Sequence, residues 1–262
     1  MTEQISPEAT MQTDLTAQPS SPAQPMQTPP LLAVLWDFDG TLVDTEPAWQ
    51  RAEHEFMAKY GAVWTHEDAI QLTGAPWRRV AGALREAAQA QGKVVEQYDW
   101  SIYQELFMSV VAHTNAGDVP WAPGSQQLLA QCAAAGLKLA VASSSPPELL
   151  NAVLDRVDVK VGAIVDGQSV TKGKPDPESY FTAAQRIGVP IEQCIVLEDS
   201  KPGVASGRAS GAPVVALQTT TKHDPAPGMV VLDSLSGVHV ADLQRWHAQL
   251  SAELAASRGA AE

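Results

Sequence analysis

Six short, predominantly apolar runs constrain the fold of this chain of 262 residues more than any other feature. A run of this kind is typical of a strand that is buried on both faces, as the strands of a parallel sheet are. Segments with helical apolar spacing lie between several of the runs. This alternation predicts an α/β fold, in which a Rossmann-like parallel sheet carries helices on both faces. The six runs are residues 31–36, 137–142, 163–165, 194–197, 213–217 and 229–232.

The predicted helices carry the residues that start and stop helices. Gly136 follows the segment 125–135, at the position where glycine commonly ends a helix. The segments 147–157 and 177–187 each open with proline, which lacks an N–H that the first turn would leave unpaired in any case. The segment 240–256 has an apolar stripe along one side and predicts a closing amphipathic helix.

Two regions depart from the alternation. From residue 45 to residue 118 the apolar spacing is helical throughout, which predicts a small all-helical domain inserted into an α/β core of residues 31–44 and 119–262. Residues 1–30 hold six of the 19 prolines and show no hydrophobic periodicity. Such a segment cannot bury enough apolar surface to offset the entropy of ordering it, so we expect a disordered tail.

The strongest chemical signal follows the first predicted strand, in the sequence DFDGTLVDTE of residues 37–46. Asp37 and Asp39 stand two residues apart at the carboxyl end of this strand, and Gly40 comes next. Ligands bind in the crevice beyond such strand ends in open parallel sheets. A buried pair of carboxylates is costly unless a positive group compensates it. The run therefore indicates a ligand site, against the alternative of a plain strand end with a capping Asp and a glycine turn.

Three more motifs follow in order, each at the end of a predicted element. A serine ends the sequence LAVAS after the second strand, a lysine lies in KGKPDP before a helix, and an acidic pair ends IVLED. Lys172 competes with Lys174 for the lysine position, and the Gly-Lys-Pro run favours Lys174. The residues that these motifs supply are Ser143, Lys174, Glu198 and Asp199.

With these four motifs, residues 31–240 resemble the haloacid dehalogenase-like superfamily, in its phosphatase branch with a helical cap inserted after the first motif, similar to β-phosphoglucomutase and its related phosphatases. The resemblance implies a phosphoric monoester hydrolase in which Asp37 attacks phosphorus and forms an aspartyl-phosphate. Asp39 would act as the general acid and base, and Lys174 would neutralise developing charge. Ser143 and backbone amides around Gly40 and Ser144 would hold the phosphate oxygens.

The resemblance also implies Mg²⁺ as the cofactor. The Asp37 carboxylate, the Asp39 backbone carbonyl and the Asp199 carboxylate would hold the ion, and Glu198 would ligate it directly or through water. Charge balance favours this set, because a divalent ion and one ammonium match the charges of a carboxylate nucleophile and a phosphate dianion. Mg²⁺ also prefers oxygen ligands. In related phosphatases the region after Trp77 meets the active site, so Arg78 or Arg79 would touch the substrate.

Three activities are compatible with this resemblance. The first is hydrolysis of a small phosphorylated metabolite, such as a sugar or polyol phosphate. The second is a sugar phosphomutase, but these enzymes carry a histidine twelve residues after the nucleophile, where this chain has Trp49, which cannot shuttle a proton. The third is a regulator that binds a phosphorylated ligand without turnover, which would not need Asp39 as an acid and base. Hydrolysis is favoured.

Composition excludes several other classes. The formal net charge of −13 and the lack of a basic stripe argue against a nucleic-acid partner. No run of eighteen apolar residues and no signal peptide is present, so we expect a cytoplasmic protein without a membrane partner. Cys132 and Cys194 do not form a zinc motif or a disulfide scaffold, and the six histidines show no metal-ligand spacing. We expect the tryptophans of the insertion to be core residues, with a substrate pocket as the alternative.

Overall fold

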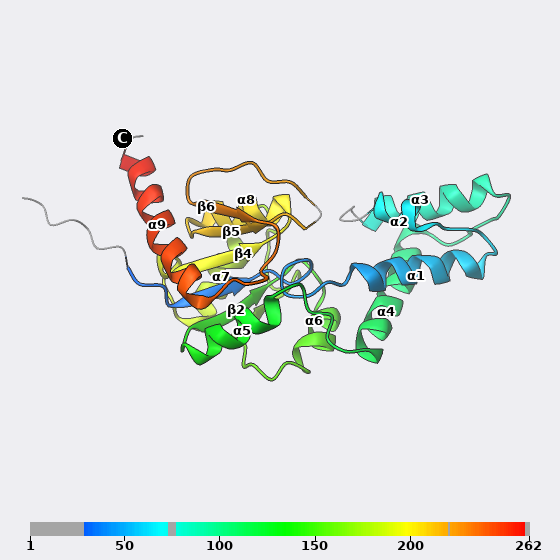
Figure 1. Ribbon diagram of the computed structural model, residues 1–262. Helices are drawn as coiled ribbons and strands as arrows, with labels where there is room; N and C mark the ends of the chain where they lie inside the picture. Colours follow the sequence, from blue (N-terminus) through cyan, green and yellow to red (C-terminus); the bar gives the residue numbers. More distant parts are fainter. Residues whose placement is uncertain (1–28, 73–76, 220, 260–262) are drawn as a thin grey trace, which may run out of the picture.

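The central sheet is parallel, as the apolar runs predict. The structure is a computed structural model that describes residues 29–72, 77–219 and 221–259, so the predicted tail lies outside it except for its last two residues. Six strands are ordered β3-β2-β1-β4-β5-β6, and each pairs in parallel with its neighbours (Figure 1). The strands are β1 (Ala33–Trp36), β2 (Lys138–Ala142), β3 (Ala163–Val165), β4 (Cys194–Glu198), β5 (Val214–Leu217) and β6 (Met229–Leu232).

The sheet is buried on both faces. Successive side chains of a strand point to opposite sides, and each side packs into an apolar core. In β1, Val34 and Trp36 belong to one apolar core, and Ala33 and Leu35 belong to the other. Helices α5, α6 and α9 contribute leucines to the first core, and α7 and α8 contribute to the second. These helices are α5 (Ser125–Ala134), α6 (Pro147–Leu154), α7 (Glu178–Ile187), α8 (Lys201–Ser210) and α9 (Val240–Gly259). The covered sheet confirms the α/β fold class.

The elements in the described part of the chain between β1 and α5 are helices, and Figure 1 shows them standing to one side of the sheet. Helices α1 and α4 pack along each other, and α3 packs on α4. The four helices are α1 (Glu46–Lys59), α2 (His66–Ile70), α3 (Trp77–Ala90) and α4 (Asp99–Ala116). A cap domain of residues 45–118 on a core of 31–44 and 119–262 stays our proposal for the domain division. None of the described helices is both long and apolar enough to cross a membrane.

Helix α8 was not among the predicted segments. Ser200 caps its first turn by accepting a hydrogen bond from the Gly203 N–H at 3.1 Å, and Pro202 lies in that turn. The sequence analysis gives no helix here, since small residues dominate α8 and its apolar stripe is thin. The 3₁₀ turn η1 (Ile191–Gln193) precedes β4 and was also not predicted.

Candidate active site

A cavity of about 810 Å³ opens beyond the carboxyl ends of β1, β2 and β4. Strand β1 is flanked by β2 on one side and β4 on the other, so the cavity lies where the strand order reverses direction, the usual place for ligands in such sheets. Its described lining includes most of the predicted site. The charged residues of this lining are Asp37, Asp39, Asp44, Glu46, Lys174, Asp199, Lys201 and Asp233.

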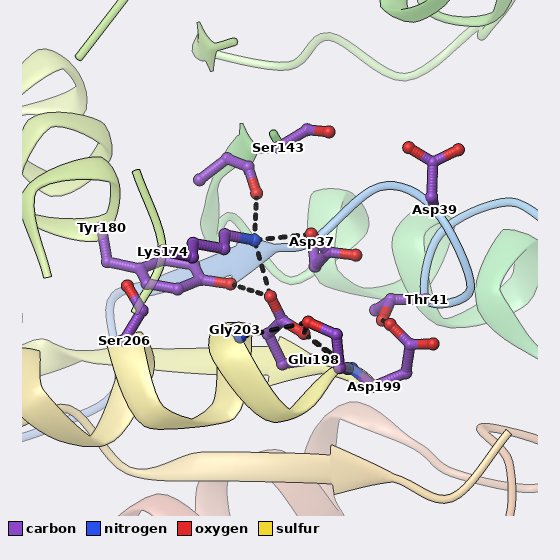
Figure 2. A network of polar contacts seen from close by, with 12 residues as sticks. Asp37, Asp39, Thr41, Ser143, Lys174, Tyr180, Glu198, Asp199, Gly203 and Ser206 are labelled. Carbon is purple, nitrogen blue, oxygen red and sulfur yellow. Dashed lines mark hydrogen bonds and ion pairs between the residues drawn. The ribbon is translucent and has the colours of Figure 1, made fainter. Parts of the chain in front are cut away.

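Lys174 is the centre of the site (Figure 2). Its Nζ donates hydrogen bonds to Asp37 Oδ1 and Glu198 Oε1, both at 2.6 Å, and to the Ala142 carbonyl oxygen at 2.9 Å. The Lys174 side chain is only 5% exposed, and the ammonium lies 4.9 Å from the centre of the Tyr180 ring. The segment before α7 thus places one buried cation between the ends of β1 and β4.

Both carboxylate oxygens of Glu198 are engaged by protein donors. Besides Lys174, Oε1 accepts from the Tyr180 hydroxyl at 3.0 Å. Oε2 accepts from the N–H groups of Asp199 at 2.9 Å and Ser200 at 3.0 Å, and from the Ser200 hydroxyl at 3.1 Å. Gly203 leaves room for this carboxylate, because a Cβ at that position would lie 1.6 Å from Glu198 Oε1. Glu198 is therefore fixed in one orientation.

Asp199 is held by residues from two loops. Thr219, in the loop after β5, donates to Asp199 Oδ2 at 2.8 Å, and Thr41 donates to Oδ1 at 3.4 Å. A ring nitrogen of His223 lies 2.6 Å from the Asp199 backbone oxygen. Gly40 has φ of +84°, and a Cβ there would lie 2.2 Å from Asp199 Oδ2. The positive φ and the close approach together explain why glycine follows Asp39.

Asp39 stands apart from the network around Lys174 (Figure 2). Its Oδ1 accepts from the Thr45 hydroxyl at 2.6 Å, and its Oδ2 accepts from the Ser145 hydroxyl. Burial raises the pKa of Asp39, and the two hydroxyl donors oppose this rise. A carboxyl group with a raised pKa holds its proton more readily, which suits a group that gives and takes a proton.

Electrostatics couples the other charged groups. Burial and the charge of Glu198 raise the pKa of Asp37 well above its ordinary value, although Lys174 opposes the rise. Burial and Glu198 also raise the pKa of Asp199, to about 6. Burial alone would lower the pKa of Lys174, but the charges of Asp37 and Glu198 outweigh burial and raise it. The site therefore has more negative charge than its own cation neutralises.

This donor set fits a divalent metal ion. Carboxylate oxygens of Asp37, Glu198 and Asp199 lie within 4.8 Å of one another, and all three residues are buried. Three carboxylates against one ammonium leave two negative charges, and hard oxygen ligands suit Mg²⁺. Among the described residues, Glu198 accepts five hydrogen bonds from protein donors, whereas Asp199 accepts one at each oxygen and Asp37 accepts one from Lys174, so Asp37 and Asp199 are the freer ligands of the three.

The structure brings most of the predicted residues together, but not all of them. Ser143 and Ser144 line the cavity, and Ser143 Oγ accepts from the Ser145 N–H at 2.9 Å. Lys172 is exposed and lies away from this network, with Nζ 3.8 Å from Asp176. Lys201, which the sequence analysis does not assign to the site, begins α8 and lines the cavity.

The two predicted substrate arginines lie outside the described lining of the cavity. The Arg78 guanidinium lies 4.7 Å from the centre of the Trp77 ring. Arg79 reaches towards Glu86, with its Nη1 3.6 Å from Oε2, and both side chains are exposed. Contact of either arginine with substrate stays a prediction.

Five residues that hold the site were not assigned to it from the sequence: Thr45, Ser145, Tyr180, Thr219 and His223. A usable signal existed for Thr219, since the polar run after β5 also follows the carboxyl end of a parallel strand. His223 is one of the six histidines without metal-ligand spacing, and its ring contacts the backbone oxygen of Asp199.

Comparisons with known proteins identify the family of this chain. A family model described as haloacid dehalogenase-like hydrolase matches residues 31–211. The phosphorylated carbohydrates phosphatase of Thermotoga maritima is 30% identical over 184 residues, which are 68% of this chain and 81% of that protein. Hexitol phosphatase B of Escherichia coli (strain K12) is 30% identical over 224 residues, 83% of this chain and 99% of that protein. A solved structure, a mutant of CbbY from Rhodobacter sphaeroides in complex with xylulose-(1,5)bisphosphate, aligns with a TM-score of 0.66 and 26% identity over 82% of this chain and 99% of that one.

Proposed function

This chain belongs to the haloacid dehalogenase-like hydrolases and is a phosphoric monoester hydrolase, and from that premise we propose that it is a Mg²⁺-dependent phosphatase for small sugar or polyol phosphates. Two relatives that match most of this chain are named as a phosphatase of phosphorylated carbohydrates and as a hexitol phosphatase. Both cysteines are free and buried, which fits a reducing compartment, so the proposal places the enzyme in the cytoplasm.

One observation carries the proposal: Lys174 bridges Asp37 and Glu198 at 2.6 Å each on the wall of the cavity. A carboxylate nucleophile must be aimed, and the Lys174 ammonium fixes one oxygen of Asp37 while Oδ2 stays available for attack. The same ammonium offsets the repulsion between this carboxylate and a phosphate dianion. A purely structural ion pair would not need a cavity of this size in front of it.

The residues would act in two steps. In the first, Asp37 Oδ2 attacks phosphorus and the P–O bond to the substrate alcohol breaks, while Asp39 gives its proton to the leaving oxygen. In the second, Asp39 takes a proton from water, the water oxygen attacks phosphorus, and the bond to Asp37 breaks. The products are the alcohol and inorganic phosphate, and both aspartates return to their starting states.

Other groups would bind and orient the phosphoryl group. Ser143 and the backbone amides near Gly40 and Ser144 would hold its oxygens, since all three residues line the cavity. Mg²⁺, held by Asp37, Asp199 and the Asp39 backbone carbonyl, would supply positive charge against the phosphate. Glu198, the remaining predicted ligand, would contribute its charge and keep Lys174 in place.

Hydrolysis is favoured over phosphoryl transfer between sugars by Trp49. An indole has one N–H donor and no acceptor, so Trp49 cannot relay a proton as the histidine of sugar phosphomutases would. A mutase must return the phosphoryl group to a second position of its substrate and needs that relay. Water remains as the acceptor in this chain.

The proposal predicts hydrolysis of glycerol 2-phosphate, a small ester without a ring, by the purified protein in Mg²⁺. Release of inorganic phosphate should stop in EDTA and return when Mg²⁺ is added in excess. Asp37→Asn should lower kcat by about a thousandfold or more, because amides are poor nucleophiles. Asp233→Asn, a change on the rim of the same cavity, serves as the matched control and should retain activity. Activity that persists in EDTA, or in Asp37→Asn, would contradict the assignment.

A further inference from the structure

The insertion carries a connected group of aromatic rings that the proposed chemistry does not use. Trp49 of α1 stacks on Tyr103 of α4, with ring centres 6.3 Å apart and planes at 16°. Tyr103 also contacts Phe107 at 6.0 Å, and its other neighbours are Trp77 at 5.4 Å and Trp100 at 5.5 Å. We call these five residues the aromatic cluster. Among the five, only Phe107 is buried, with 8% exposed, and Trp100 is 53% exposed.

Trp49 places this cluster next to the cavity. Residues Thr45 and Glu46 line the cavity, and Trp49 follows them by four and three positions in the first turn of α1. Residues at this spacing lie on the same face of a helix. Figure 1 shows that the first turn of α1 is the part of this helix nearest the sheet. Trp49, whose side chain is half-buried, therefore lies within one helical turn of this part of the lining, although it is not itself a lining residue.

Tyr103 gives an independent link between the cluster and the site. Burial raises the pKa of the Tyr103 hydroxyl, and the charges of Asp39 and Glu148 add to the rise, so this hydroxyl lies within electrostatic reach of Asp39. Within the described residues the hydroxyl makes no hydrogen bond, and it is free to bind a hydroxyl group of a substrate. The rings of Tyr103 and Phe107 also pack against the indole of Trp49, with ring centres 6.3 and 6.5 Å away.

The charge around the cluster limits what it can bind. The described lining of the cavity has six acidic residues and two lysines, and Lys174 is committed to Asp37 and Glu198. Arg78 stacks on Trp77, which contacts Trp100 and Tyr103, whereas Trp49 contacts Tyr103 and Phe107. A second phosphate next to Trp49 would therefore meet aromatic faces and acids, whereas an uncharged group would meet no unfavourable charge.

We propose that the aromatic cluster, with Trp49 as the contact residue, binds the apolar face of a six-membered sugar ring whose only phosphate is the one transferred. The inference rests on the proposed phosphatase function and names its substrate class. Aromatic faces carry partial negative charge and attract the C–H groups on one face of such a ring. A ring is already rigid, while an open-chain polyol loses rotational freedom when it lies flat on an indole.

Glucose 6-phosphate and sorbitol 6-phosphate test the inference, because they share carbon count, ester type and charge and differ in ring closure. The wild-type kcat/KM should favour glucose 6-phosphate by about tenfold, mainly through KM. Trp49→Ala should bring that ratio to about one, and Trp49→Phe should restore most of it. Glycerol 2-phosphate, which has no ring, should be hydrolysed by all three proteins at rates within about threefold of each other.

A matched control uses Trp246 of α9, another half-buried tryptophan, on the opposite side of the sheet from the insertion (Figure 1). Trp246→Ala removes the same side chain and should keep the wild-type preference. A ratio unchanged in Trp49→Ala, or a wild-type preference for sorbitol 6-phosphate or for glucose 1,6-bisphosphate, would overturn the sugar-ring site. If the wild type does not hydrolyse glycerol 2-phosphate, the proposed phosphatase function is wrong. Failure of the sugar-ring site and failure of the phosphatase function therefore give different results.

Discussion

At the scale of single residues, the function depends on how firmly Lys174 is held. Glu198 orients Lys174 through Oε1, and the same oxygen accepts a hydrogen bond from the Tyr180 hydroxyl at 3.0 Å. Tyr180 is fully buried, and its ring also faces the ammonium. Tyr180 would thus act on Asp37, the proposed nucleophile, through Glu198 and Lys174, as a positioning residue rather than a catalytic one.

Tyr180→Phe keeps the ring and removes this hydrogen bond. We expect kcat for glycerol 2-phosphate to fall by about threefold to tenfold with little change in KM, because the loosened Lys174 aims Asp37 less well. The free energy of unfolding should drop by about 1–2 kcal/mol, since one buried acceptor loses a donor. Steady-state kinetics and urea denaturation measure the two effects.

Tyr60→Phe supplies the matched control for this change. The Tyr60 hydroxyl donates to Gln97 at 2.9 Å within the insertion, so its removal also costs one hydrogen bond. Its kcat should stay at the wild-type value. If the two variants lower kcat equally, Tyr180 has no positioning role and contributes only to stability.

At the scale of elements, helix α1 carries a titratable group that its packing disfavours. Glu53 is 5% exposed and accepts a hydrogen bond from the Trp64 indole at 3.0 Å. Burial raises the pKa of Glu53 from 4.5 to about 7, against the effect of this hydrogen bond. The folded protein therefore holds a proton on Glu53 between these two pH values, where the unfolded chain does not.

The sign of the pH effect follows from this difference. The raised pKa of Glu53 contributes up to about 3 kcal/mol to the free energy of unfolding. This contribution is complete below pH 4.5 and is lost as the pH rises through about 7. Glu53→Gln keeps an acceptor for Trp64 without the charge. It should raise the free energy of unfolding by about 2–3 kcal/mol at pH 8 and have little effect at pH 4.5. Urea denaturation followed by tryptophan fluorescence measures both.

Glu55→Gln, two residues further along α1, is the control for Glu53→Gln. Glu55 is exposed and pairs with His113, and its pKa is lowered by that contact, so its substitution should give no stabilisation at pH 8. A gain for Glu53→Gln that is the same at pH 4.5 and pH 8 would show that the carboxyl is not neutral when folded.

The elements themselves were predictable because strand and helix leave periodic traces in the sequence. The run 163–165 matches β3 residue for residue, and β4 extends the predicted run by one residue, Glu198. Parallel pairing then places the ends of β1 and β4 side by side, so Asp37 and Asp199 could be expected to meet. Side-chain partners such as Tyr180 and His223 depend on rotamers and loop paths, which periodicity does not encode.

At the scale of the whole molecule, the formal charge of −13 and the buried acids of the site both disfavour the folded state through repulsion between negative charges. Any added cation screens the general repulsion among surface acids, and this effect depends only on ionic strength. A divalent ion bound by Asp37 and Asp199 would do more, because it binds the folded protein and not the unfolded chain. Thermal unfolding can separate the two contributions.

Mg²⁺ at about a hundred times its dissociation constant should raise the Tm by about 5–10 °C over NaCl of equal ionic strength. In Asp199→Asn, the Tm without metal should equal or exceed that of the wild type, because one of three neighbouring negative charges is gone, while most of the Mg²⁺ shift should disappear. Asp233→Asn, on the cavity rim, also removes one negative charge and should keep the full shift. If Mg²⁺ raises the Tm of Asp199→Asn as much as that of the wild type, this carboxylate is not a ligand. The result holds whatever the effect of EDTA on activity, because the thermal shift reports metal binding without turnover.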